Sequence, residues 1–225
     1  MAYKMVALMP MRHNSERVPG KNYRPFGDGR PLFQHMLDVL VACKRIDKVV
    51  IDTDSPTVRD ICAKDYPQVL VLERPEELRD GAIPMNRILL HDTEQVASEY
   101  YLQTHSTNPL MTLATVEAAI DTFLAQAPTF DSLFTVTKVQ TRLWDPLTRA
   151  VNHNPNILLR TQDLPPLFEE NSCLYIFAKN ILLERQNRLG LRPYMLEMDP
   201  FEAIDIDNEI NFQVAEAVWH ATRKA

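Results

Sequence analysis

A short segment near the N-terminus gathers side chains that could bind a chain of phosphates. Residues 10–22 read PMRHNSERVPGKN and place Arg12, Arg17 and Lys21 within ten positions. Arg and Lys pair well with phosphate oxygens, so three cations on one loop suit a triphosphate. The segment has neither the GxxxxGK[ST] nor the GxGxxG pattern, so phosphate contacts would come mainly from side chains. A solvated loop whose charges pair with neighbouring acids fits these residues equally well.

A pair of carboxylates near the C-terminus could hold a metal ion. Asp205 and Asp207 flank Ile206. If the segment is extended, both carboxylates share one face and Ile206 turns into the core. Two oxygen ligands suit Mg²⁺, which completes its octahedron with water and substrate phosphates. The alternative is that Asp207 only caps a helix that begins near Asn208.

Two other patterns carry weaker signals. Asp52 and Asp54 form a DxD after an apolar run, as in the nucleophile motif of haloacid-dehalogenase-like phosphatases, but Pro56 follows almost at once. The histidines lack the HxxxH or HExxH spacing of zinc ligands, so we expect no zinc site. His105 either faces a ligand from the end of a strand or satisfies nearby backbone groups.

Alternating strands and helices must position these residues. Short apolar runs bounded by polar residues indicate buried strands, and the segments between them have helical spacing. This alternation predicts a doubly wound α/β fold, with a mainly parallel sheet flanked by helices on both faces. In such a sheet ligands bind beyond the carboxyl ends of the strands, where residues 10–22 would lie. The strands are expected at 6–9, 49–51, 69–72 and 100–102, and the helices at 32–43, 58–62 and 88–97.

The second half of the chain interrupts this regularity once. Residues 138–171 are rich in Pro, Asn, Arg and Asp and show little periodicity, which indicates an insertion of loops and short strands. We therefore predict a single domain over residues 1–225 with an insertion at 138–171. The remaining elements are expected as helices at 116–124, 181–188 and 208–222 and strands at 132–136, 173–177 and 194–196.

Composition narrows the class of protein. With 225 residues, 45% of them hydrophobic, the chain can bury one substantial core. Its formal net charge of -6 argues against nucleic acid as a partner, because that binding usually requires a concentrated basic face. Three scattered cysteines support no disulfide framework, and no apolar stretch approaches a membrane span. We expect a cytoplasmic protein with no membrane partner.

The sequence resembles a known enzyme family. Residues 7–26 resemble the N-terminal signature of the acylneuraminate and 3-deoxy-octulosonate cytidylyltransferases, xARxxSxRxPxKNxxxx. The matching residues are Arg12, Ser15, Arg17, Pro19, Lys21 and Asn22. Further similarity includes Thr53-Asp54, Arg74-Pro75, Gln103, Asn108-Pro109-Leu110, Arg160, Gln162-Asp163, Asn171, Tyr175-Ile176 and Asp205-Ile206-Asp207.

This resemblance implies a nucleotide-diphospho-sugar transferase-like fold and a reaction. The anomeric hydroxyl of an acidic 2-keto sugar, such as a sialic acid, would attack the α-phosphate of CTP and release pyrophosphate. Arg12 and Lys21 would be catalytic, and Asp205 and Asp207 would bind Mg²⁺. The nucleotide-binding residues implied are Arg12, Ser15, Arg17, Lys21, Asn22, Arg74 and Gln103.

The positions that concern the sugar depart from the family pattern. Residues 82–85, 104–109 and 171–173 differ from the segments usual in sialic acid enzymes. In the family the insertion reaches a second subunit, which implies a homodimer. Arg160 is the candidate carboxylate clamp, because a guanidinium grips a carboxylate with two parallel hydrogen bonds. The other candidates for recognising the sugar are Gln103, Arg142, Trp144, His153 and Gln162.

Two alternatives remain open from the sequence. One is a nucleotidyltransferase that uses another base or a sugar without a carboxylate. The other is a non-catalytic nucleotide- or sugar-binding protein on the same fold. The joint presence of Arg12, Lys21, Asp205 and Asp207 favours an intact catalytic site.

Overall fold

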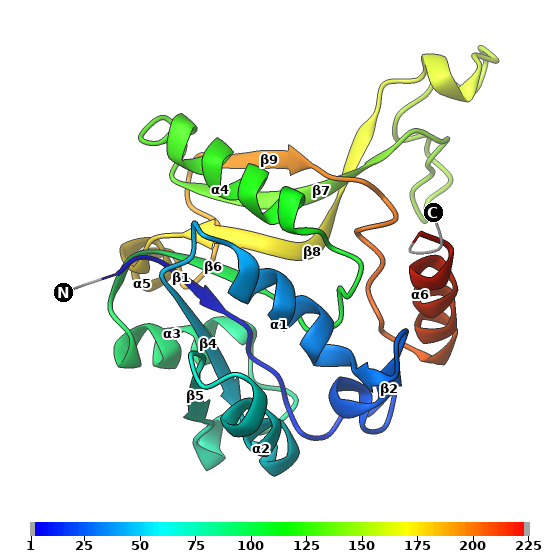
Figure 1. Cartoon of the computed structure of the whole chain (residues 1–225). Helices are drawn as coiled ribbons and strands as arrows, with labels where there is room; N and C mark the ends of the chain where they lie inside the picture. Colours follow the sequence, from blue (N-terminus) through cyan, green and yellow to red (C-terminus); the bar gives the residue numbers. More distant parts are fainter. Residues whose placement is uncertain (1–2, 223–225) are drawn as a thin grey trace.

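A computed structural model describes residues 3–222 and shows a seven-stranded sheet with helices on both faces (Figure 1). Residues 1–2 and 223–225, which the single-domain prediction includes, lie outside the described residues. The strand order is β5-β4-β1-β6-β8-β7-β9. The strands are β1 (Tyr3–Leu8), β4 (Lys48–Thr53), β5 (Leu70–Glu73), β6 (Ser98–Thr104), β7 (Ser132–Val139), β8 (Leu167–Phe177) and β9 (Pro193–Glu197).

The sheet is mainly parallel, as predicted. β1 pairs in parallel with β4 and β6, β4 pairs in parallel with β5, and β7 pairs in parallel with β9. β8 is antiparallel to both β6 and β7. The chain runs outward from β1 to β5 and then crosses back to β6, so the direction of winding reverses beside β1. Open α/β sheets bind ligands at such a switch point.

The helices cover both faces of the sheet, which confirms the doubly wound fold. In β1, Met5 and Ala7 belong to the core beneath α1, α2 and α4, whereas Val6 and Leu8 belong to the core beneath α3 and α5. Strand side chains alternate between faces, so each strand contributes to both cores. The helices are α1 (Leu32–Ala42), α2 (Pro56–Asp65), α3 (Met85–Gln95), α4 (Leu113–Gln126), α5 (Lys179–Arg185) and α6 (Glu209–Thr222), with short 3₁₀ helices η1 (Lys21–Tyr23), η2 (Glu76–Leu78) and η3 (Thr161–Asp163).

A third, smaller core joins the N-terminal loop to the last helix. Phe212 and Trp219 of α6 pack with Phe26, which lies in the short hairpin of β2 (Pro25–Phe26) and β3 (Arg30–Pro31). Val18 and Ile206 complete this cluster and are fully buried. The contact fixes the carboxylate pair at 205–207 relative to the cationic loop. This contact was not predictable from the sequence, because two-residue strands carry no periodicity.

Gly27 in this hairpin is the position at which we expect a single methyl group to loosen α6. Its φ is +58°, and an added Cβ would lie 2.7 Å from the Trp219 ring. Gly27→Ala should therefore lower the free energy of unfolding by roughly 1 to 3 kcal/mol, through both backbone strain and overpacking. Chemical denaturation measures the loss.

Gly29→Ala is the matched control. Gly29 also has a positive φ, +89°, but an added Cβ would meet nothing within 4 Å. Gly29→Ala should therefore lower the free energy of unfolding only through backbone strain, without the overpacking. Equal losses in the two variants would contradict the packing role assigned to Gly27.

The segment predicted as an insertion joins β7 to β8. β7 and β8 remain paired out to Lys138 with Phe168 and Val139 with Leu167, so the ends of the predicted 138–171 segment are strand. The irregular part covers residues 140–166, called the arm below. Figure 1 shows the arm extending away from the sheet. Among the described helices, none is both long and apolar enough to cross a bilayer.

Candidate active site

A cavity of about 340 Å³ lies at the carboxyl end of β1. It is formed by the loop after β1, by Gly81 and by residues 105–107 after β6. Met11 pairs with Thr53 at the end of β4, which holds the loop over the switch point. The structure therefore brings together the residues predicted from the loop. The predicted nucleotide-binding residues that line the cavity are Arg12, Ser15, Arg17, Lys21 and Asn22.

Asn22 secures the shape of this cavity. Its Nδ2 donates to the Arg12 carbonyl oxygen at 2.8 Å, and its Oδ1 accepts from Ser106 Oγ at 2.8 Å. The side chain thus ties the loop to the segment after β6. Since Asn22 is almost fully buried, it is a positioning residue for Arg12 more than an open contact for a ligand.

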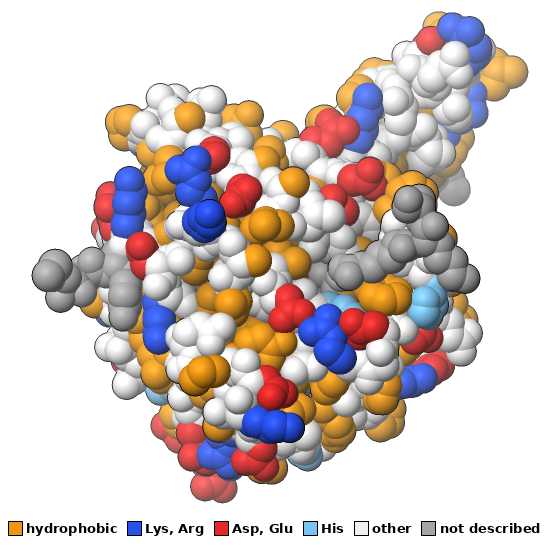
Figure 2. Space-filling view, in the orientation of Figure 1, with side chains coloured by type: hydrophobic (Ala, Val, Ile, Leu, Met, Phe, Trp, Pro, Cys, Tyr) orange, Lys and Arg blue, Asp and Glu red, His pale blue; other side chains and the backbone are white. Residues whose placement is uncertain are grey.

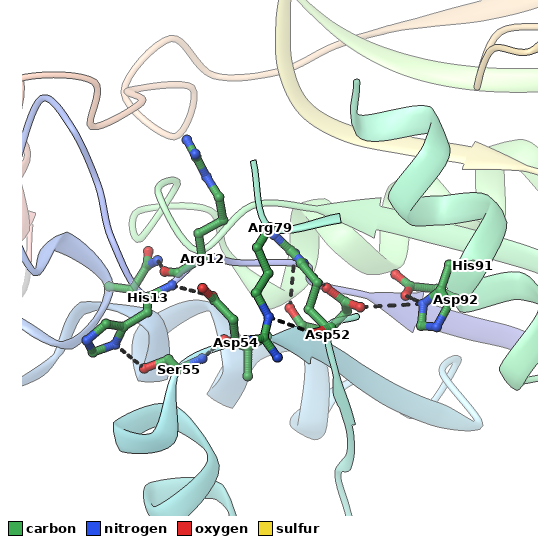
Figure 3. A network of polar contacts seen from close by, with 11 residues as sticks. Arg12, His13, Asp52, Asp54, Ser55, Arg79, His91 and Asp92 are labelled. Atoms are coloured by element: carbon green, nitrogen blue, oxygen red, sulfur yellow. Dashed lines mark hydrogen bonds and ion pairs between the residues drawn. The ribbon is translucent and has the colours of Figure 1, made fainter. Parts of the chain in front are cut away.

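The three cations have different surroundings. Lys21 Nζ donates to the Ile206 carbonyl oxygen at 2.5 Å. Burial lowers the pKa of Lys21, and the nearby carboxylates of Asp205 and Asp207 oppose that shift. Arg17 Nη2 lies 2.8 Å from Asp207 Oδ1. Arg12 has only a loose contact with Glu16 at 3.8 Å, and Figure 3 shows its side chain directed away from the polar network beneath the loop. Arg12 is thus the most available of the three for a ligand.

The segment that carries Asp205 and Asp207 has the predicted arrangement. Ile206 is fully buried, and both carboxylates are partly exposed. Asn208, not Asp207, caps α6, since its Oδ1 accepts from the Asn211 amide at 2.9 Å. The capping alternative for Asp207 is therefore wrong.

These carboxylates fit a hard divalent cation. Burial and the charge of Asp207 raise the pKa of Asp205, although a hydrogen bond from Thr107 and the charges of Lys21 and Arg17 act against this. A divalent cation held by these carboxylates would offset the same repulsion, and Mg²⁺ in proteins takes oxygen ligands such as carboxylates.

Arg74 does not line the cavity, contrary to its predicted contact with the nucleotide. It is 1% exposed, its Nε donates to Asp52 Oδ1, and its Nη2 donates to the Asp52 carbonyl oxygen at 3.2 Å. Asp52 is fully buried, so it cannot attack a phosphate, and the phosphatase reading is wrong. The next carboxylate, Asp54, accepts from the His13 amide at 2.7 Å (Figure 3). The DxD motif therefore supports the loop from below.

Asp92 on α3 lies beside the buried Arg74–Asp52 ion pair. Burial, together with the charge and hydrogen bonding of Asp52, raises the pKa of Asp92 to about 9. One oxygen of each carboxylate is buried without a hydrogen-bond partner among the described residues. A proton held on Asp92 and shared with Asp52 satisfies both oxygens. His91 also lies near, with its Nδ1 at 3.6 Å from Asp52 Oδ2.

This shared proton predicts a pH dependence of stability. Asp92 is protonated in the folded protein and ionised in the unfolded chain between about pH 4 and pH 9, so the free energy of unfolding should fall as pH rises through that window. Asp92→Asn keeps a hydrogen-bond donor and removes the ionisation. At pH 8 it should be at least as stable as the parent, with a flatter pH profile in urea denaturation. Asp65→Asn, at an exposed position, should leave the slope unchanged. A destabilised Asp92→Asn variant with the parent's slope would contradict the shared proton.

Gln103 is also buried, although it was predicted to touch both nucleotide and sugar. Its Oε1 accepts from Arg188 Nη1, and its Nε2 lies 3.1 Å from His105 Nε2. His105 does line the cavity, so it faces the ligand space as one of its two expected placements allowed. Sequence reasoning missed Arg188, which follows α5 and reaches this region only through the fold.

The predicted sugar-binding residues of the arm lie apart from the cavity. Arg160 holds Asp163 with two bonds of 2.7 and 3.1 Å, and Arg142 Nη2 donates to the Leu159 carbonyl oxygen. The Gln162 carbonyl oxygen accepts from Gln140. The Trp144 and His153 rings touch edge to face, with centroids 4.9 Å apart. Within one chain, none of these arm residues lines the cavity.

The fold and this cavity define a class of protein. A cationic loop over the switch point of a doubly wound sheet, with a pair of carboxylates beside it, is a nucleotidyl-transfer type of site. Residues 6–218 match a family model described as "Cytidylyltransferase". The chain belongs to the cytidylyltransferase family.

Curated relatives and solved structures agree with this family. The N-acylneuraminate cytidylyltransferase of Streptococcus agalactiae serotype V is 23% identical over 93% of this chain and 52% of its own length. The chain thus spans about half the length of the first relatives it matches. The CMP-N,N'-diacetyllegionaminic acid synthase of Legionella pneumophila is 23% identical over 99% of each chain. A CMP:2-keto-3-deoxy-manno-octonic acid synthetase solved in complex with CTP shares the fold, with a TM-score of 0.70 at 15% identity over 97% of this chain and 99% of that chain.

Proposed function

We propose that this protein transfers CMP from CTP to the anomeric hydroxyl of an acidic 2-keto sugar and releases pyrophosphate. The observation that carries the proposal is the placement of Arg12, Arg17 and Lys21 around one cavity, beside Asp205 and Asp207. The named relatives act on N-acylneuraminate and N,N'-diacetyllegionaminic acid, which supports an acidic acceptor for this chain.

The proposed mechanism is mainly electrostatic. Nucleotidyl transfer requires in-line positioning and neutralisation of the negative charge that spreads at the α-phosphate. Arg12 and Lys21 donate to the phosphate oxygens in the transition state, and Asn22 holds Arg12 in place. Asp205 and Asp207 would hold Mg²⁺, which neutralises charge on the triphosphate when bound. Ser15 and Arg17 bind the remaining phosphates.

We further propose that the active form is a homodimer in the cytoplasm. The arm exposes large apolar side chains that a single chain leaves uncovered, and Figure 2 shows basic side chains beside them. Paired arms would bury this surface and carry Arg142, Arg160 and Gln162 toward the cavity of a second copy. The described cysteines are free and buried, in keeping with a reducing compartment. The exposed apolar residues of the arm are Trp144, Leu147, Val151, Ile157, Leu158 and Leu159.

A pyrophosphate-release assay tests the proposal. The protein is incubated with Mg²⁺, each of four nucleoside triphosphates, and a panel of N-acylneuraminate, N,N'-diacetyllegionaminic acid, 3-deoxy-manno-octulosonate and neutral ketoses. We expect pyrophosphate to be released only when CTP is combined with one of the sugar acids. Release with another nucleotide or a neutral sugar would favour the alternative nucleotidyltransferase. Binding of CTP without any release would favour the non-catalytic alternative. Light scattering of the same sample measures the oligomeric state.

A further inference from the structure

Arg188 is a largely buried cation that the mechanism above does not use. Its guanidinium carbon lies 3.7 Å from the centre of the Tyr175 ring, and Nη1 donates to Gln103 Oε1. Gln103 and Tyr175 are direct partners across β6 and β8. The guanidinium therefore lies over the end of the sheet that carries the cavity, on the α5 face.

The Tyr175 ring beneath Arg188 is hydrogen-bonded to a residue with an unusual backbone conformation. Ser172 has a φ of +58°, a left-handed conformation that residues with a side chain rarely adopt. Its Oγ lies 3.1 Å from Tyr175 Oη, which also donates to Glu170. Backbone strain of this kind persists only where the surroundings impose it, and it is concentrated at binding sites. The Tyr175 ring is thus fixed before any ligand arrives.

The charge of Arg188 is not balanced within the described part of the chain. Its Nε is buried without an acceptor, and Gln103 Oε1 is its one hydrogen-bond acceptor among the described residues. The charges of Tyr175 and Glu170 favour its ionised form, but neither forms a hydrogen bond or ion pair with it among the described residues. A guanidinium offers five N–H donors, so most of them are unused. Burial lowers the pKa of Arg188, as expected for a desolvated cation that lacks a paired anion.

Arg188 is connected to the cavity through two hydrogen-bonded residues. Because Gln103 Oε1 accepts from Arg188, the amide orientation is fixed, and Gln103 Nε2 donates to His105 Nε2. His105 then carries its proton on Nδ1. Burial and the charges of Arg188 and Lys21 lower the pKa of His105 to about 4, so the imidazole is neutral. Lys21 and His105 thus line the cavity, and Arg188 lies behind the neutral histidine, joined to it through Gln103.

We propose that Arg188 binds the anionic group of the acceptor and selects acidic acceptors over neutral ones. This inference rests on the proposed transfer reaction, because it supplies the acceptor half of the same site. Lys21 and Arg12 belong to the loop and serve the triphosphate, whereas Arg188 contacts β6 and β8 through Gln103 and Tyr175. Arg160, the candidate from sequence, already has a carboxylate partner in Asp163. Arg188 has none among the described residues, and its planar fork matches a carboxylate.

The test compares Arg188→Gln and Arg188→Lys with the parent, in the full chain, on the most active sugar acid of the panel and its carboxamide. Loss of one charge-assisted contact should raise the KM for the acid roughly 10- to 100-fold in Arg188→Gln and leave the KM for CTP unchanged. The ratio of acid to amide kcat/KM should fall toward one. Arg185→Gln, an exposed position at the end of α5, is the matched control and should behave as the parent does.

Two results in Arg188→Gln would overturn the inference: an unchanged ratio of acid to amide kcat/KM, or a rise in the KM for CTP instead of the KM for the acid. If Arg188→Gln does not fold, a parental KM for the acid in Arg188→Lys would overturn it. Calorimetric titration of the same acid and amide into parent and variants gives the answer without turnover. Failure of the transfer reaction itself would appear separately, as no pyrophosphate release by the parent. In that case titration with 3-deoxy-manno-octulosonate and its amide decides, and equal affinity for the two would overturn the role of Arg188.

Discussion

Replacing Lys21 with methionine should lower kcat by about 10² to 10³ while the protein remains folded. Lys21 is a preorganised donor at the place where negative charge develops, and loss of one such donor typically costs that much. Methionine keeps the apolar part of the side chain, so the partly buried stem still packs. Arg12→Ala should lose a similar factor. Steady-state pyrophosphate release gives the rates, and thermal denaturation checks the fold.

The control for these variants is a lysine of the same charge in an exposed position. Lys44 lies in the turn after α1 and does not line the cavity, so Lys44→Ala should keep full activity. Since Lys21 also bonds to the Ile206 carbonyl oxygen, part of any loss could come from movement of the 205–207 segment. A lower melting temperature in Lys21→Met would reveal that movement. Full activity in Lys21→Met or Arg12→Ala would remove the triphosphate assignment.

Replacing Asp207 with asparagine should abolish most of the metal-dependent activity, by about 10² or more, because one oxygen ligand loses its charge. Chelation of divalent ions should have the same effect on the parent, and excess Mg²⁺ should restore it. The stability of Asp207→Asn should stay close to that of the parent, because Asn208 caps α6. Activity is measured as a function of Mg²⁺ concentration.

Asn208→Ala should lose stability and keep activity, the reverse of Asp207→Asn, so the two variants separate capping from metal binding. It removes the hydrogen bond to the Asn211 amide and should cost about 1 kcal/mol of stability while activity is retained. An active Asp207→Asn variant would contradict metal binding by Asp207. A destabilised Asn208→Ala variant that is also inactive would show that activity requires the order of this segment as well as its charges.

The fold was predictable from sequence because buried parallel strands are short apolar runs that can be recognised one at a time. The runs at 6–9 and 49–51 became β1 and β4, and the alternation with helices fixed the doubly wound arrangement. The hairpin of β2 and β3 and its contact with Trp219 were not predictable, because they join segments nearly two hundred residues apart.

The candidate site was predictable where its residues are close in sequence. Arg12, Ser15, Arg17, Lys21 and Asn22 share one loop, so they meet at the same cavity whatever the details of the sheet. Burial was the part that sequence did not reveal. The faces on which Arg74 and Gln103 lie depend on strand register and on partners that are distant in sequence, and both side chains proved to be buried.

Arg188 is the reverse case, a candidate site residue that the sequence did not indicate. It follows α5 without any motif, and only the pairing of β6 with β8 brings Gln103 and Tyr175 together beneath it. The arm residues were predicted to bind the sugar because their side chains suit a sugar acid. Strand pairing out to Val139 and Leu167 carries them away from the cavity of their own chain. In the proposed homodimer their contribution would come from a second copy, which a single sequence does not place.

The most direct test of the account is to follow the phosphorus atoms of CTP by ³¹P NMR in the presence of Mg²⁺ and the preferred sugar acid. Transfer of CMP predicts that the three CTP resonances disappear together, replaced by one phosphodiester resonance and by pyrophosphate in equal molar amounts. No phosphodiester should form when the acid is omitted. Release of inorganic phosphate and CDP, or an unchanged CTP spectrum with every acid of the panel, would contradict a cytidylyl transfer at this site.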